Sequence, residues 1–192
     1  MPTEPRGAAR RRALLEATVR VIGRGGIAAV DHRAVAAEAG VPLGSTTYYF
    51  ESKGDMVAQA LQHVADREAE RIGMELERGV LDKGDGPPAE RLADVMLDVW
   101  AGDRVVLLAQ FELYLESGRR EDLRPAAARW DGAYRRLLER ALEEAGGRDV
   151  QRRAHLLCVS LDGLLLEHVA SGGALSDLRE LAVEVIELML TK

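Results

Sequence analysis

The sequence has a single cysteine, Cys158, and aromatic residues make up only 4% of its 192 residues. One cysteine excludes an intrachain disulfide and a cysteine cluster for a metal, and it fits a reducing cytoplasm. Because apolar residues reach 47%, the core must consist mainly of Leu, Val and Ala. We expect no membrane span, since no apolar run approaches the required length, and no signal peptide, since the N-terminus is rich in Pro, Arg and Glu.

Motifs for catalysis are also missing. The four histidines lack a metal-binding spacing such as HExxH, and neither a nucleophile motif nor a phosphate-binding glycine loop is present. His155 and Asp162 are seven residues apart and can share a helix face, but this alone is a poor basis for catalysis. We therefore expect no enzyme, no metal site and no cofactor.

The charge is unevenly distributed. The net charge of −6 is unusual for a protein that binds nucleic acid. Residues 1–55 carry eight Arg or Lys against six Asp or Glu, a net +2, which leaves −8 on the remaining residues. A mildly basic head on an acidic body would orient the molecule on DNA, but the imbalance is too modest to establish function.

The most informative segment is residues 31–55, DHRAVAAEAGVPLGSTTYYFESKGD. It predicts a first helix over His32–Ala39, with Asp31 as its N-cap and Gly40 at its end. Pro42 can begin a second helix over Leu43–Tyr49. Two short helices joined by a tight turn form a helix-turn-helix. The alternative is a buried helical corner whose Tyr and Phe side chains belong to the core.

The second helix carries short residues that can approach base edges in the major groove. The tyrosine hydroxyls and Lys53 can reach phosphates. His32 can touch a phosphate, although a single histidine at a helix start is more often merely exposed. Arg10, Arg11 and Arg12 suit phosphates or the minor groove, or else form a solvated basic helix end.

This segment resembles the DNA-binding domain of the tetracycline-repressor-like (TetR) family of bacterial regulators. The resemblance covers roughly residues 8–60, and the rest of the chain agrees with the family in length and helical character. The matching residues are Ala36, Ala39-Gly40-Val41, Gly44-Ser45, Tyr48-Tyr49-Phe50 and Ser52-Lys53. Two positions depart from the family: Leu43 is more often polar and Thr47 more often Tyr. The operator sequence therefore cannot be transferred from a relative.

The resemblance implies that Arg33 contacts a base or a phosphate, and a bidentate arginine–guanine contact contributes about 1–3 kcal/mol of discrimination. The predicted DNA-binding residues are His32, Arg33, Leu43, Gly44, Ser45, Thr46, Thr47, Tyr48, Tyr49 and Lys53.

Helical periodicity extends through the whole chain, without a strand pattern or a repeat. We expect an all-α fold of about nine helices: a three-helix head in residues 1–53 and a helical bundle for ligand binding and dimerisation in residues 54–192. The other predicted helices cover Arg10–Gly23, Gly54–Val80, Ala89–Ala101, Asp103–Ser117, Pro125–Ala145, Arg148–Ala170 and Ser176–Leu190. Residues 66–71 read as a charged, solvated face of the long helix, and residues 84–88 as a loop within the body.

The last two predicted helices are apolar over wide faces. Packing of this pair against a second copy would form a four-helix interface with two-fold symmetry, and the resemblance implies the same homodimer. Two heads one DNA turn apart, about 34–36 Å, would then match a palindrome. Alternatively, these helices only complete the core of a monomer.

Aromatic side chains at helical spacing usually serve packing, which is the alternative to a ligand site. The family's pockets lie in the body. Candidate ligand-binding residues are Met96, Trp100, Gln110, Phe111, Tyr114, Trp130, Tyr134, Cys158 and Asp162. The charge of Asp162 needs a partner, either an arginine such as Arg135 or a ligand. The scarcity of other buried polar candidates favours a largely apolar effector.

The sequence therefore predicts a homodimeric, cytoplasmic repressor that binds a double-stranded DNA operator and is released by a small-molecule effector. The alternative is a small-molecule-binding or carrier protein without specific DNA recognition, which the departures at Leu43 and Thr47 keep open.

Overall fold

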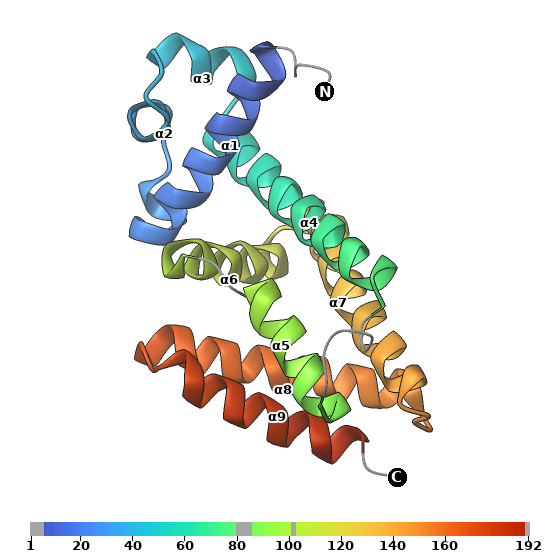
Figure 1. The fold of residues 1–192 in the computed structure, drawn as a ribbon. Coiled ribbons are helices and arrows are strands. Elements are labelled where there is room, and N and C mark those ends of the chain that lie inside the picture. Colours follow the sequence, from blue (N-terminus) through green and yellow to red (C-terminus); the bar gives the residue numbers. More distant parts are fainter. Residues whose placement is uncertain (1–5, 80–85, 101–102, 191–192) are drawn as a thin grey trace. The chain divides into compact units, whose positions relative to one another are not determined.

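The computed structural model describes residues 6–79, 86–100 and 103–190. Within these ranges the chain forms nine α-helices, two short 3-10 turns and no strand, which confirms the all-α fold (Figure 1). In order, the elements are α1 (Arg6–Gly25), η1 (Ile27–Ala29), α2 (His32–Ala39), α3 (Leu43–Tyr49), α4 (Lys53–Glu77), α5 (Pro88–Trp100), α6 (Arg104–Arg119), η2 (Glu121–Leu123), α7 (Arg124–Glu144), α8 (Val150–Ser171) and α9 (Leu175–Leu190).

Helices α2 and α3 begin and end at the predicted residues, because their caps are encoded locally. The other helices differ from prediction by small shifts at their ends, except that α1 begins earlier, at Arg6. The turns η1 and η2 were not predicted. Val80, Ala101 and the Gly84-Asp85 part of the predicted loop lie outside the described residues.

The described residues fall into two compact units. Unit 1 comprises residues 6–65 and 103–127, and unit 2 comprises residues 66–79, 86–100 and 128–190. Helix α6 therefore shares a unit with the three head helices, while α4 and α7 each contribute residues to both units. The predicted functional boundary between residues 53 and 54 stays a prediction.

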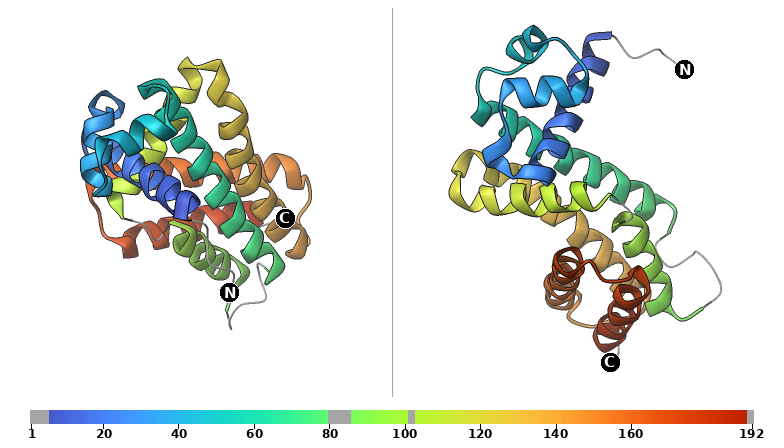
Figure 2. Two further views of the ribbon diagram at one scale, coloured as in Figure 1. Left: turned by 90° about the horizontal axis from the view of Figure 1, so that it is seen from above. Right: turned by 90° about the vertical axis from the view of Figure 1, so that its left-hand side faces the viewer.

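Unit 1 is built around α1, which packs against both α2 and α6 (Figures 1 and 2). The apolar stripe of α1 supplies the buried side chains Leu14, Leu15, Val19 and Ile22. A Cβ atom on Gly23 would lie 1.8 Å from the carbonyl oxygen of Val105 in α6, so only glycine permits this approach of the two helices.

In unit 2, α9 packs against α5 and α8, and the three helices lie side by side in Figures 1 and 2. Leu178, Ala182 and Ile186 form the buried stripe of α9. Arg179 fixes α9 to α5 through two bonds to Asp94, from Nε to Oδ1 at 2.7 Å and from Nη2 to Oδ2 at 3.3 Å.

Helix α8 is long and apolar enough to cross a membrane by length and composition, which corrects the expectation that no apolar run approaches such a length. One such helix is weak evidence for a membrane span. Only 28% of its most apolar stretch is buried, and Leu156, Val159 and Leu166 are exposed. The feature to be explained is thus an uncovered apolar face on α8.

We predict that Gly23→Ala destabilises the protein by about 1–3 kcal/mol, the usual cost of forcing an extra carbon into a packed contact. The reason is that the backbone of Val105 cannot rotate away as a side chain would. Thermal unfolding monitored by circular dichroism measures the effect. Gly118→Ala in α6 is the control, because a Cβ there meets nothing within 4 Å; equal melting temperatures for both variants would contradict the prediction.

Candidate functional site

The helix-turn-helix is closed by a cap at each end of α2. The Asp31 Oδ1 accepts a hydrogen bond from the Ala34 amide at 2.8 Å, and this bond holds the pKa of Asp31 below its ordinary value. At the other end Gly40 has φ 65° and ψ 34°, the left-handed conformation that favours glycine. The Val41 amide then donates to the Ala36 carbonyl at 3.0 Å. Both predicted caps are confirmed.

The rotation of α3 about its axis is set by Thr46. Its side chain is fully buried, and its hydroxyl donates to the Leu43 carbonyl at 2.8 Å and lies 3.4 Å from the His32 carbonyl. Phe50, one turn later, is also buried. Thr46 was predicted to contact DNA; the structure corrects this, since its side chain faces the core and stabilises the corner between the two helices.

With Thr46 inward, α3 turns its other face to solvent. Gly44, Thr47 and Tyr48 are exposed there, and Leu43 is 48% exposed at its flank. Tyr48 is 82% exposed, and its ring meets that of Tyr49 edge-on at 4.9 Å between centroids. This surface therefore combines Gly44, which has no side chain, with the apolar side chain of Leu43 and the phenol hydroxyl of Tyr48.

The other predicted DNA-binding residues occupy varied settings. Arg33 is exposed on the first turn of α2, and Ser45 is half-buried. His32 is half-buried, and its Nδ1 atom has no hydrogen-bond partner among the residues that the structure describes. The Tyr49 hydroxyl donates to the Gly7 carbonyl at 3.1 Å, and Lys53 Nζ donates to the Ala28 carbonyl at 2.9 Å. Their contacts with DNA stay predictions.

Two arginines counted in the basic head are engaged within the protein. Arg20 Nε donates to Glu38 Oε1 at 2.6 Å, and Arg24 Nη1 pairs with Glu38 Oε2. These bonds, that of Arg20 above all, hold the pKa of Glu38 below its ordinary value. They fix α1 to α2 and pair both arginines with a carboxylate that the sequence count already includes.

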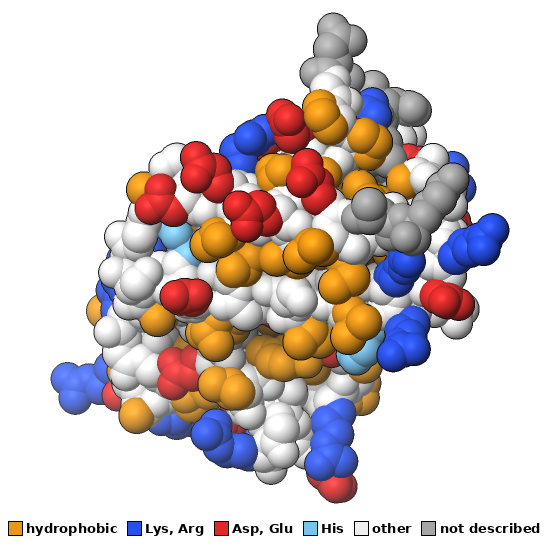
Figure 3. Space-filling model, turned by 90° about the horizontal axis from the view of Figure 1, so that it is seen from below, with side chains coloured by type: hydrophobic (Ala, Val, Ile, Leu, Met, Phe, Trp, Pro, Cys, Tyr) orange, Lys and Arg blue, Asp and Glu red, His pale blue; other side chains and the backbone are white. Residues whose placement is uncertain are grey.

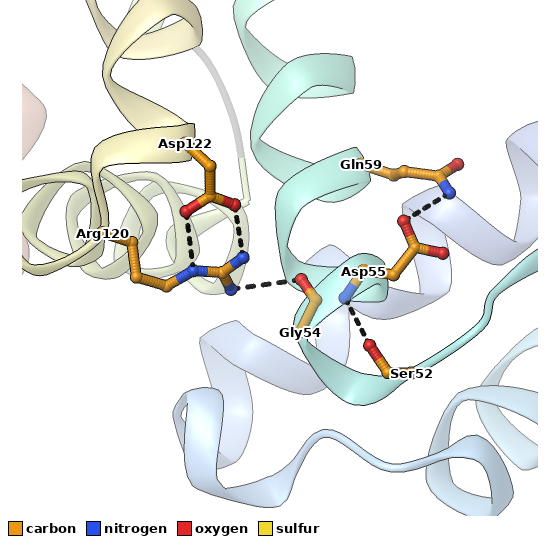
Figure 4. A network of polar contacts seen from close by, with 6 residues as sticks. All are labelled: Ser52, Gly54, Asp55, Gln59, Arg120 and Asp122. Carbon is orange, nitrogen blue, oxygen red and sulfur yellow. Dashed lines mark hydrogen bonds and ion pairs between the residues drawn. The ribbon is translucent and has the colours of Figure 1, made fainter.

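The first turn of α4, directly after α3, is held by a polar network (Figure 4). Ser52 Oγ accepts from the Asp55 amide at 3.1 Å and thereby caps the helix. Arg120 Nη1 donates to the Gly54 carbonyl at 3.1 Å, while its Nε and Nη2 donate to the two Asp122 oxygens at 3.2 and 2.6 Å. The residues at the end of α6 and in η2 therefore hold the start of α4, the helix that follows α3 in the chain.

Another contact joins α6 to the head within unit 1. The Ile27 amide, at the start of η1, donates to Glu112 Oε1 at 2.8 Å. Sequence reasoning missed Glu112 and Arg120, because both act on backbone groups far away in the chain. Together they place α6 among the elements that position the helix-turn-helix.

The predicted ligand-binding residues are divided between the two units. Gln110 and Phe111 are half-buried and Tyr114 is exposed on α6, in unit 1. In unit 2, Met96, Trp100 and Tyr134 are buried, whereas Trp130 is half-buried. Their roles as ligand contacts stay predictions.

Glu68 corrects the expectation that residues 66–71 form a solvated face. Its side chain is buried in unit 2, where Tyr134 donates to Oε2 at 3.0 Å and Arg71 lies 3.3 Å from Oε1. Arg71 also donates to the Asp98 carbonyl at 2.5 Å. Burial, followed by the nearby Glu68 carboxylate, raises the pKa of Tyr134. The cluster ties α4 to α5 and α7 and supplies a buried charge that the sequence did not reveal.

Asp162 does not form the expected pair with Arg135 among the described residues; its Oδ2 lies 3.8 Å from the Cys158 sulfur. Desolvation raises the pKa of Asp162 to about 6, with the charge of Asp131 as a second cause. The side chain keeps contact with solvent, so the desolvation is partial. Desolvation and the same carboxylates raise the pKa of Cys158 to about 12, so its thiol is protonated at neutral pH.

Family comparisons agree with this architecture. Residues 14–60 match the model "Bacterial regulatory proteins, tetR family" and residues 87–192 match "Tetracyclin repressor-like, C-terminal domain". The chain belongs to the TetR family. It is accordingly a transcription regulator with a DNA-binding helix-turn-helix rather than an enzyme.

Curated relatives include a transcriptional repressor, KstR, from Mycolicibacterium smegmatis, 40% identical over 83 residues, which are 43% of this chain and 38% of KstR. The regulator PksA of Bacillus subtilis is 30% identical over 99 residues, which are 52% of this chain and 45% of PksA. The chain thus matches less than half the length of either relative.

Solved TetR-like structures match over nearly the whole chain. The multidrug binding protein EbrR complexed with ethidium has a TM-score of 0.70 and 33% identity, over 95% of this chain and 99% of that one. SCO1917, a TetR family member from Streptomyces coelicolor A3, has a TM-score of 0.69 and 33% identity, over 92% and 97% of the two chains.

We predict that Asp162→Asn raises the melting temperature more at pH 7 than at pH 4. The folded-state pKa of about 6 exceeds the unfolded value of 3.8, so the folded protein binds more protons between these values and loses stability as pH rises through them. Asparagine removes this loss. Melting temperatures from pH 4 to 8 measure it, and a difference between variant and wild type that is independent of pH would contradict it.

Proposed function

We propose that the protein is a repressor that binds a palindromic operator as a homodimer and is released by a small-molecule effector. The observation that carries the proposal is the outward face of α3, which exposes Gly44, Thr47 and Tyr48, while Arg33 is exposed on the first turn of α2. A second helix exposed in this way enters the major groove, while the first helix crosses the phosphate backbone. Access to DNA implies a cytoplasmic location.

The dimer rests on α8 and α9. Leu156, Val159, Gly163 and Leu166 recur at helical spacing on α8 and are exposed, and Figure 3 shows hydrophobic side chains gathered on the face that it views. A contiguous exposed apolar patch of this kind marks a protein interface. Since the same patch exists on every copy, two-fold pairing covers it on both.

Helix α9 contributes to the same interface. Leu181 and Leu188 are exposed to one side of the buried stripe of the helix, and Leu188 is 74% exposed. Exposed leucines beside the buried stripe of a terminal helix are expected when a second copy covers them. The dimer then supplies two heads to two half-sites.

The effector is proposed to be a largely apolar, aromatic molecule bound in residues 54–192. EbrR has been crystallised with ethidium, proflavin and malachite green. In this chain Met96 and Trp100 supply apolar surface, and Glu68 supplies a buried carboxylate. An effector that prefers the state with misplaced heads weakens DNA binding by its differential affinity.

The continuous helix α4 is the proposed route of this coupling. Its first turn is bonded to Arg120 in unit 1, and its second half is bonded to Tyr134 and Asp98 in unit 2. A ligand that rearranges the second set of bonds therefore acts on the helix that directly follows α3. In this proposal, residues 1–53 form the DNA-binding part on which α4 acts.

We predict that Arg33→Ala weakens specific DNA binding about tenfold or more, as loss of an arginine contact to a base or phosphate requires. The assay uses the DNA flanking the coding region, then random-sequence selection, with scrambled competitor present. Ethidium affinity, measured without DNA, should be unchanged, and Arg136→Ala on α7 is a matched control. Failure of the wild type to select any sequence would favour the carrier alternative.

We predict that Val159→Glu converts the dimer into a monomer, because it places a charge in the centre of an apolar interface without disturbing the monomer core. Light scattering after size-exclusion chromatography measures the mass. Leu115→Glu is the control, since Leu115 is a comparably exposed leucine in unit 1. A wild-type monomer at micromolar concentration, or a dimeric Val159→Glu variant, would refute the proposed interface.

A further inference from the structure

The two threonine hydroxyls of α3 are both engaged within the helix. Thr46 and Thr47 each donate a hydroxyl hydrogen bond within the helix, to the carbonyls of Leu43 and Gly44 at 2.8 and 3.2 Å. Neither hydroxyl proton is therefore available for a base. The large apolar side chain beside them, that of Leu43, is 48% exposed within the described part of the chain.

Gly44 stands next to Leu43, on the side of α3 opposite Thr46. Gly44 is the second residue of α3, where alanine would be the better helix former, so its presence needs a reason. It does not have a positive φ, and a Cβ built on it meets nothing within 4 Å. Neither backbone conformation nor internal packing requires glycine here, which leaves close approach to something outside the protein.

We propose that Leu43 contacts the 5-methyl group of a thymine in each operator half-site, and that Gly44 lets α3 lie deep enough in the major groove for this contact. The inference rests on the proposed operator-binding function. The thymine methyl is the apolar group that base pairs display in the major groove. An exposed leucine on a helix in the major groove buries apolar surface against this methyl group. Contact with phosphates or polar base edges would not give it such apolar burial.

The size of the effect follows from the surface covered. Burial of one methyl group contributes a factor of about four in affinity, and two half-sites in one dimer contribute about 15-fold. Such a contact distinguishes thymine from uracil, which differs only in that methyl group, and leaves every hydrogen bond of the base pair unchanged.

The test begins with the operator obtained by random-sequence selection with the wild-type dimer. Each thymine of the selected site is then replaced by deoxyuridine, symmetrically in both half-sites, and affinity is measured for wild type, Leu43→Ala and the control Leu115→Ala. We expect one thymine position at which wild type and Leu115→Ala lose about 15-fold, whereas Leu43→Ala is insensitive to the replacement. Gly44→Ala should weaken binding to the selected site while slightly raising the melting temperature.

The failures are distinguishable. If selection yields no specific sequence, the operator-binding function itself fails. If a specific site is found but wild type tolerates deoxyuridine at every position, the thymine contact is refuted and the function stands. A loss that persists in Leu43→Ala also refutes it, because another residue then contacts that methyl. Unchanged melting temperatures of the leucine variants verify that folding is intact.

Discussion

The burial of Thr46 decides what the molecule presents to DNA. A seven-residue helix has few contacts with which to fix its rotation, and α3 uses one inward threonine and the neighbouring Phe50. The Thr46 hydroxyl is satisfied by the helix's own Leu43 carbonyl, so its burial carries no unpaired polar group. Once Thr46 faces inward, Gly44 and Tyr48 must face outward, since they lie about half a turn away.

The corner held by Thr46 is supported from outside the predicted head. Arg120 binds the backbone of Gly54, and Glu112 binds the backbone of Ile27, so α6 holds elements before and after the helix-turn-helix. The close contact between Gly23 and Val105 adds a third attachment. The DNA-binding segment therefore belongs to a larger compact unit. The two parts of that unit, residues 6–65 and 103–127, are separated by a long stretch of chain.

Sequence reasoning succeeded where structure is determined by neighbours in the chain. The bounds of α2 and α3 follow from Asp31, Gly40 and Pro42, each of which acts within a few residues. It failed for Thr46 and Glu68, because a polar residue at helical spacing reads as exposed unless its partner is known. The partner of Glu68 is Tyr134, 66 residues away, and no local pattern identifies such a pair.

The same limit explains the charge and the apolar face of α8. A count of basic residues treats Arg20 and Arg24 as available, whereas both pair with Glu38. By length and composition α8 could cross a membrane, whereas in the structure it packs against α9. The outer stripe with Leu156 and Leu166 remains uncovered in one copy. A helix that is apolar on two faces can pack against two partners: α9 is the partner within the chain, and a second copy is the partner that we propose for the other face.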